Sequence, residues 1–117
     1  MYSAKVMDHF QNPRNVGDMP DADTVGSAGS PTCGDILKLY LKFHNGRVSR
    51  ATFKTFGCGA AIAASSMLTE MVIGKTVSEL KSITNTQVAE ALGGLPPIKM
   101  HCSVLAEQAL KSALEKR

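Results

Sequence analysis

The chain has 117 residues, of which 44% are apolar, 20% are charged and 5% are aromatic, and its formal net charge is +3. This length suits one domain with a modest core over residues 1–117, and no apolar run is long enough to span a membrane or to act as a secretory signal. The charges are dispersed and aromatic residues are few, which disfavours the clustered basic and stacking surface typical of nucleic-acid-binding proteins.

The N-terminal segment predicts one short helix followed by a loop. Ser3 can cap a helix over residues 4–11, because its hydroxyl can accept a hydrogen bond from the free N–H groups of the first turn. Residues 13–31 are rich in Pro, Gly, Asp and Ser, which indicates a loop with one edge strand near residues 23–28. We expect the loop within residues 1–22 to be mobile.

An alternating segment, a tight turn and a second strand predict a β-hairpin. Every second residue of 36–44 is apolar, so this strand has one buried face, formed by Leu37, Leu39, Leu41 and Phe43. Asn45-Gly46 follows, and both residues tolerate the positive φ of a two-residue turn. The partner strand is expected over residues 47–56.

Helical patterns occupy most of the second half of the chain, in residues 60–73, 76–82, from Thr84 or Thr86 to 92, and 103–116. Gly74 suits the C-terminal end of the first of these helices, and Leu95-Pro96-Pro97 predicts an extended, exposed loop before the last. Strands therefore precede helices, which predicts an α+β fold. We expect a small three-stranded antiparallel sheet with helices packed on one face and an amphipathic C-terminal helix.

The three cysteines stand in separate motifs, GSPTCGD around Cys33, FKTFGCGAAIA around Cys58 and LPPIKMHCS around Cys102. Asp35 lies two residues after Cys33, and His101 directly precedes Cys102, so two of the thiols have a second metal-ligating group beside them. An odd cysteine count with no sign of export indicates a cytoplasmic protein with free thiols. We predict that the fold gathers these five residues into one exposed site that holds an iron–sulfur cluster for release.

The setting of the thiols supports this chemistry. Cys58 and Cys102 each stand just before a predicted helix, where the helix dipole and the free N–H groups favour thiolate over thiol. Three thiolates with one weaker ligand differ from the closed ligand sets of structural zinc sites and permanent clusters. A fourth ligand from Asp35 or His101 would be exchangeable, which suits transient carriage of a cluster.

These residues also have structural interpretations. A lone cysteine is often a small buried apolar residue, Asp35 can cap a turn, and His101 can be a surface histidine. His9 and His44 are expected to be ordinary surface histidines. A hydrolase built on Cys102 and His101 is disfavoured, because sequence neighbours seldom have the geometry of a nucleophile and its base.

Four ordered motifs, the opening KVMDHFQNPRNVG and the three cysteine motifs, resemble the U-type iron–sulfur cluster assembly scaffold family across essentially the whole chain. The resemblance implies a carrier rather than an enzyme, on which a [2Fe–2S] cluster is built from iron and from sulfur delivered by a cysteine desulfurase. It further implies transfer of the cluster to acceptor apoproteins, assisted by an Hsp70-type chaperone and its J-domain co-chaperone. A ferredoxin as electron source, a frataxin-like protein and a second copy of the chain complete the expected partners.

The resemblance assigns roles by position. Cys33, Cys58 and Cys102 match the cluster cysteines of the family, and Asp35 matches the aspartate that makes the cluster labile. His101 matches the histidine beside the third cysteine, and Cys102 also matches the main acceptor of persulfide sulfur. The chaperone-recognition motif is matched by Leu95, Pro96, Pro97, Ile98 and Lys99, with isoleucine where valine is common.

A zinc-dependent sulfurtransferase, which accepts persulfide from a cysteine desulfurase, is the main alternative, with zinc bound in the same site. That branch of the family carries an insertion between the second and third cysteines, which is missing here between Cys58 and Cys102. It also usually has a basic residue where this chain has His101, so both differences favour the scaffold branch. The fourth cluster ligand stays open between Asp35, His101 and an external group.

Overall fold

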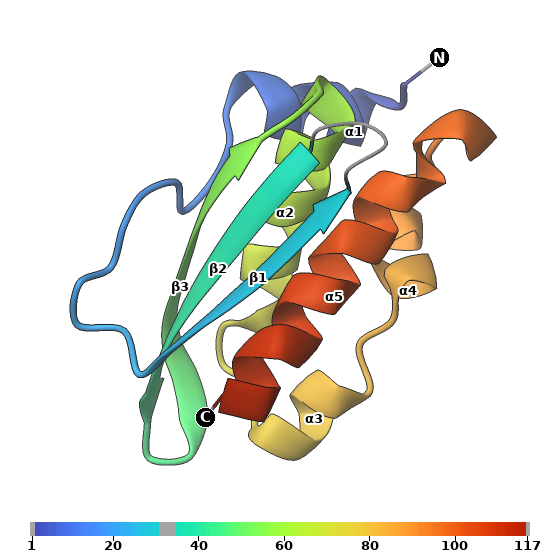
Figure 1. The fold of residues 1–117 in the computed structure, drawn as a ribbon. Coiled ribbons are helices and arrows are strands. Elements are labelled where there is room, and N and C mark those ends of the chain that lie inside the picture. Colours follow the sequence, from blue (N-terminus) through green and yellow to red (C-terminus); the bar gives the residue numbers. More distant parts are fainter. Residues whose placement is uncertain (1, 31–34, 117) are drawn as a thin grey trace.

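Three antiparallel strands form a sheet in the order β1-β2-β3, and helices cover one of its faces (Figure 1). The computed structural model describes residues 2–30 and 35–116. The strands are β1 (Thr24–Ser30), β2 (Asp35–His44) and β3 (Arg47–Phe56). The helices are α1 (Ala4–Gln11), α2 (Gly59–Val72), α3 (Val77–Lys81), α4 (Asn85–Ala91), the 3₁₀ helix η1 (Pro97–Lys99) and α5 (Met100–Lys116). The predicted α+β class and the three-stranded antiparallel sheet are confirmed.

The β2–β3 hairpin follows the sequence prediction closely. Leu37, Leu39 and Leu41 of β2 are buried beneath the helices, as their alternation indicated. Asn45 and Gly46 form the turn with φ angles of 53° and 78°, values that an Asn-Gly pair adopts at little cost. Local sequence therefore predicts the hairpin and its turn, but not the shift in register that the structure has between Lys42 and Phe43.

Helix α5 lies along β1 and covers the buried face of the sheet at that edge (Figure 1). Gly26 permits this contact, because a Cβ atom at Gly26 would overlap the α5 backbone at Ala109 and Ala113. The Thr24 hydroxyl donates a hydrogen bond to the Ala113 carbonyl over 2.7 Å. The first strand is therefore held in place by the last helix of the chain.

Capping signals set several helix boundaries. Thr76 with Glu79 and Thr84 with Gln87 both form complete capping boxes, so α4 begins after Thr84 and not after Thr86. In each box the threonine hydroxyl and the long side chain satisfy backbone N–H groups of the first turn. Across residues 2–30 and 35–116, none of these helices has the length and apolar character that a membrane crossing requires.

The last helix begins earlier than the sequence predicted. Its expected start was residue 103, but α5 begins at Met100 and follows directly on the 3₁₀ turn at Pro97–Lys99. The expectation of a wholly extended Pro-Pro segment was wrong at Pro97, because a proline in the first turn of a helix needs no N–H partner. Cys102 consequently lies inside the first turn of α5 rather than before it.

The loop between α1 and β1 packs along β3. The Phe53 N–H donates to the Asn15 carbonyl over 3.0 Å, and the Gly17 N–H donates to the Phe53 carbonyl over 2.9 Å. Met19 of the same loop is buried. These contacts fasten parts of the loop to the sheet, and the mobility expected within residues 1–22 stays a prediction.

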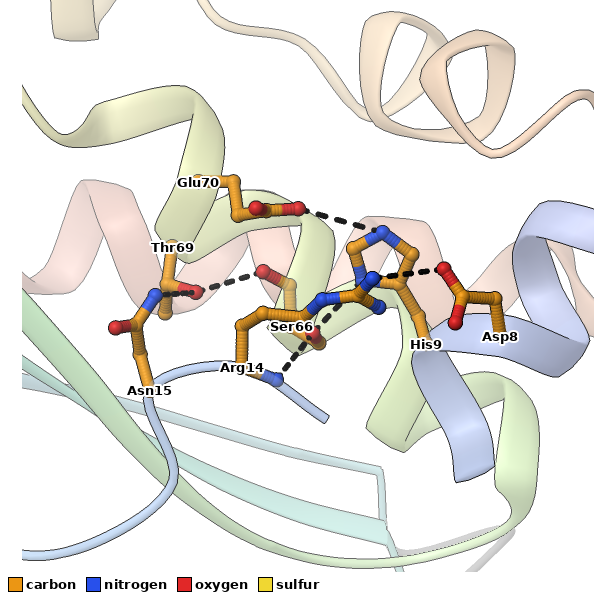
Figure 2. Close-up of polar contacts among 7 residues, drawn as sticks. All are labelled: Asp8, His9, Arg14, Asn15, Ser66, Thr69 and Glu70. Atoms are coloured by element: carbon orange, nitrogen blue, oxygen red, sulfur yellow. Dashed lines mark hydrogen bonds and ion pairs between the residues drawn. The ribbon is translucent and has the colours of Figure 1, made fainter. Parts of the chain in front are cut away.

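A polar network joins α1 to α2 (Figure 2). His9 is 4% exposed, with its Nδ1 atom 2.8 Å from Ser66 Oγ and its Nε2 atom 3.3 Å from Glu70 Oε1. The prediction of a surface histidine was wrong because His9 lies on the same helix face as the buried Val6, where α2 supplies polar partners for the ring. His44 is exposed, as expected.

The loop after α1 uses the same partners on α2 (Figure 2). The Arg14 N–H donates to Ser66 Oγ over 2.9 Å, and the Asn15 side-chain amide donates to Thr69 Oγ1 over 3.0 Å. The Arg14 guanidinium donates back to Asp8 of α1 over 2.7 Å. Ser66 therefore contacts both α1, through His9, and the loop after α1, through Arg14.

Acidification is expected to lower the free energy of unfolding through His9. Burial lowers the pKa of His9 from its ordinary value of 6.5, the Arg14 guanidinium lowers it further, and Glu70 opposes both. The unfolded chain therefore takes up a proton at higher pH than the folded chain. This contribution to stability is complete above pH 6.5 and is lost as the pH falls through the folded pKa.

Urea unfolding measured across this pH range tests the expectation. His9→Gln should flatten the pH dependence, because the group that titrates is removed. His44→Gln, a substitution of an exposed histidine, should leave the dependence as it is. Equal slopes for wild type and His9→Gln would contradict the assignment.

Candidate metal centre

The fold brings Asp35, Cys58 and Cys102 together at one end of the sheet. Asp35 is the first residue of β2, Cys58 is the N-cap of α2, and Cys102 lies in the first turn of α5. One ligand atom from each of these side chains lies within 4.8 Å of the other two. Cys33, the third predicted cysteine, lies outside the described residues. Two of the three thiols and the aspartate thus meet although they are far apart in the sequence.

His101 adjoins the same group of ligands. The two thiol sulfurs are 3.6 Å apart, Cys102 Sγ lies 3.5 Å from His101 Nε2, and His101 Nε2 lies 3.3 Å from Asp35 Oδ2. His101 Nδ1 is 3.1 Å from the Ile98 carbonyl oxygen. Because a carbonyl only accepts, Nδ1 carries a proton in this contact, and Nε2 is the ring atom that faces Asp35 and Cys102.

The Asp35 carboxylate is the least satisfied group of the site. It is 4% exposed, and its Oδ2 atom has no hydrogen-bond partner within the described part of the chain, since its approach to His101 lacks hydrogen-bond geometry. A buried carboxylate oxygen without a donor is costly unless a cation binds it. Two sulfurs, one oxygen and one ring nitrogen form a donor set that suits iron and zinc.

The protein alone does not favour a thiolate at Cys102. Its side chain is 1% exposed, and burial raises the pKa of its thiol to about 12, with further contributions from Cys58 and Asp35. The predicted preference for thiolate at Cys102 was wrong for these protein surroundings, because desolvation outweighs the effect of the helix start. Lys99 acts in the opposite direction on Cys102, and the pKa of Lys99 is itself raised, mainly by Cys58.

Alkylation of the metal-free protein should distinguish the two thiols. We expect iodoacetamide near neutral pH to modify Cys58 at least about tenfold faster than Cys102, because the reactive species is the accessible thiolate. Mass spectrometry of the cysteine peptides measures both rates, and in denaturant the two rates should converge. Faster modification of Cys102 in the folded protein would show that its burial does not control its reactivity.

Comparison with known proteins identifies the family of this chain. A model of the NifU-like N-terminal domain family matches residues 1–116. The chain belongs to this family. The NifU-like domain thus spans nearly all of the sequence, and the family resemblance drawn from the four motifs is confirmed.

Relatives of this NifU-like chain are closely similar along its length. It is 60% identical over 114 residues to the iron–sulfur cluster assembly scaffold protein IscU 1 of Archaeoglobus fulgidus, which covers 97% of this chain and 74% of the relative. It is 53% identical over 117 residues to the protein of the same description, IscU, of Escherichia coli K12, which covers 97% and 91%. A solved structure from Fervidobacterium islandicum AW-1, assigned as a scaffold protein for the SUF system, has a TM-score of 0.78 at 25% identity and covers 97% and 96%.

Gly57 is a part of the site that sequence reasoning missed. The sequence marked Gly57 only as an interruption between strand and helix. In the structure a Cβ atom at this position would lie 2.7 Å from Asp35 Oδ1. Asp35 and Gly57 lie one step beyond the Ile36–Phe56 pair at the open end of the predicted β2–β3 hairpin, but the hairpin pattern does not tell that the Asp35 carboxylate turns toward Gly57.

Proposed function

We propose that this protein is a scaffold on which an iron–sulfur cluster is assembled and from which the cluster is passed to other proteins. The observation that carries the proposal is the buried Asp35 carboxylate, whose Oδ2 atom has no hydrogen-bond partner among the described residues, beside the thiols of Cys58 and Cys102. The scaffold descriptions of relatives at 53% and 60% identity support it. In this role the cluster is a cargo and the protein is a carrier without turnover chemistry of its own.

The cluster is proposed to be [2Fe–2S], bound by Cys33, Cys58 and Cys102. The fourth ligand is proposed to be Asp35 or His101, because Asp35 Oδ2 lies 3.3 Å from His101 Nε2, which itself lies 3.5 Å from Cys102 Sγ. Such a carboxylate or imidazole is a weaker ligand for iron than a thiolate, so an acceptor can replace it first. Weak ligation at one position supports release rather than storage.

Sulfur is proposed to arrive as a persulfide from a cysteine desulfurase, with Cys102 as its acceptor. The Cys102 thiolate attacks the outer sulfur of the donor persulfide, a new S–S bond forms, and the donor leaves as a thiolate. Two electrons, proposed to come from a ferredoxin, then cleave that bond and give sulfide and the Cys102 thiolate. Because Cys102 is buried, the desulfurase must open the site or reach it through the Cys58 side.

The segment Leu95–Lys99 is proposed to bind an Hsp70-type chaperone, which assists cluster transfer together with its J-domain co-chaperone. Pro96 is extended with φ −56° and ψ 145°, and the Ile98 side chain is 80% exposed. Ile98 lies in the 3₁₀ turn Pro97–Lys99, so a groove that binds extended peptides would take Pro96 as it stands and would require this turn to unwind at Ile98. The segment leads directly into His101 and Cys102, so binding there could strain the site and promote release.

Further partners belong to the same proposal. Acceptor apoproteins take the cluster, a frataxin-like protein regulates its assembly, and a second copy of the chain can share the cluster. Ile36 and Phe56 lie beside the site and are 51% and 76% exposed, which offers an apolar surface to a partner that docks there. We propose a cytoplasmic setting, which is consistent with free thiols at Cys58 and Cys102.

An anaerobic reconstitution tests the function. The ultraviolet–visible spectrum is recorded after addition of ferrous iron, cysteine and a catalytic amount of a cysteine desulfurase, with Cys58→Ser as the matched variant. Sulfide-to-iron charge-transfer bands should appear in the wild type and be weak in the variant. A colourless protein that retains zinc and gains one sulfur atom on Cys102 would instead identify the zinc-dependent sulfurtransferase.

A further inference from the structure

Gly57 has no backbone reason to be glycine. Its φ is not among the positive values that occur at Gly46 and Gly74 and elsewhere in the described chain, and the residue is exposed. An exposed position with an ordinary φ normally accepts any side chain. The requirement for glycine at this place must therefore come from a neighbour.

That neighbour is the Asp35 carboxylate. A Cβ atom on Gly57 would lie 2.7 Å from Asp35 Oδ1, 3.1 Å from Asp35 Cγ and 3.1 Å from Ala61 Cβ. The first of these distances is below any normal carbon–oxygen contact, so something has to move. Ala61 is fixed in α2, and the Asp35 side chain is the part that can rotate.

We propose that Gly57 is a positioning residue for Asp35. The missing side chain leaves the space in which the carboxylate lies, so that one of its oxygens lies within 4.8 Å of both thiol sulfurs and its Oδ2 atom lies 3.3 Å from His101 Nε2. A methyl group at residue 57 displaces the Asp35 carboxylate from the other metal ligands. Asp35 itself, with its negative charge, stays in the protein. The steric effect on Asp35 does not depend on the proposed function. Only the expected result of the displacement, slower release of the cluster, rests on that function.

The test compares Gly57→Ala, Asp35→Ala and the double variant, with Gly59→Ala as matched control. Gly59 flanks Cys58 on the other side, and a Cβ atom there would meet the Phe10 ring, at 3.1 to 3.3 Å, rather than a ligand. Cobalt(II) added to each metal-free protein reports the ligand set through its visible spectrum. The cobalt spectrum of Gly57→Ala should match that of Asp35→Ala, and Gly59→Ala should match the wild type.

Transfer of a reconstituted cluster to an apo-ferredoxin gives the second readout. Gly57→Ala and Asp35→Ala should each slow transfer by roughly tenfold, and the double variant should differ from Asp35→Ala by less than about twofold, because both substitutions remove one and the same contact. A cobalt spectrum and a transfer rate like those of the wild type in Gly57→Ala would overturn the proposal. Additive effects in the double variant would overturn it as well.

Thermal unfolding covers the case in which Gly57→Ala does not fold. The proposal then requires the double variant to fold as well as Asp35→Ala, because the clashing carboxylate is gone. If the double variant also fails to fold, Gly57 is needed for packing against Ala61 and not for Asp35. The cobalt comparison needs no cluster. It therefore tests the positioning of Asp35 by Gly57 even if the protein proves not to be a scaffold.

Discussion

Asp35→Ala is expected to slow transfer of the cluster to an acceptor roughly tenfold. This factor corresponds to about 1.4 kcal/mol of stronger binding between the cluster and its ligands. Two features of the site give this direction. The Asp35 carboxylate is a hard oxygen donor that suits iron less well than a nitrogen or sulfur donor, so a site without it should hold the cluster more tightly. His101 Nε2, which lies 3.5 Å from Cys102 Sγ, can then take the vacated position with a stronger donor.

The decay of visible absorbance on addition of an apo-ferredoxin measures this rate. Asp21→Ala is the matched control, because it removes an exposed carboxylate that pairs only with the remote Lys42 among its described partners. The control should transfer its cluster as fast as the wild type. If absorbance decays equally fast in wild type and Asp35→Ala, the role given to Asp35 in release is wrong.

Gly26→Ala is expected to destabilise the fold by about 3 kcal/mol, at the upper end of the usual cost of overpacking. The added methyl group would overlap the α5 backbone at Ala109 and Ala113, and backbone cannot rotate away as a side chain can. Helix α5 must therefore move off β1. Because α5 also carries Cys102, the variant should lose part of its metal affinity.

Gly29→Ala on the same strand provides the control. Among the described residues, a Cβ atom at Gly29 would meet only the Asp35 carbonyl oxygen, at 3.6 Å. This is an ordinary contact, so the stability of Gly29→Ala should change by less than about 0.5 kcal/mol. Thermal unfolding should show a midpoint about 10 °C lower for Gly26→Ala and one close to the wild type for Gly29→Ala. Equal losses would mean that β-propensity, and not the contact with α5, governs both sites.

Elements with strong local signals could be predicted from sequence. The alternation of β2, the Asn45-Gly46 turn and the capping box of Thr76 with Glu79 each specify structure within a few residues, and all three occur as expected. The family could also be recognised, because the cysteine motifs are themselves short segments. The candidate ligands could be named as well, because Cys, Asp and His are metal-ligating residue types wherever they occur in a sequence.

Tertiary packing overturned the predictions made for three individual features of the chain. His9 was placed on the surface because its partners Ser66 and Glu70 are distant in the sequence. The start of α5 was placed too late, since a proline normally signals a break and here begins a turn. The ionisation of Cys102 was inferred from the helix start alone, whereas burial among residues from three elements dominates it.

The sequence by itself determined the types of secondary structure, the chemistry of the ligands and the family, because these depend on side-chain identity and on neighbours a few residues apart. Only the tertiary structure showed how closely Asp35, Cys58 and Cys102 approach one another, and that side chains at Gly26 and Gly57 would meet the α5 backbone and the Asp35 carboxylate. The physical reason is that close contacts between distant segments leave no periodic pattern in either segment. Their effect is steric and electrostatic, and it exists only once β1, β2, α2 and α5 have packed together.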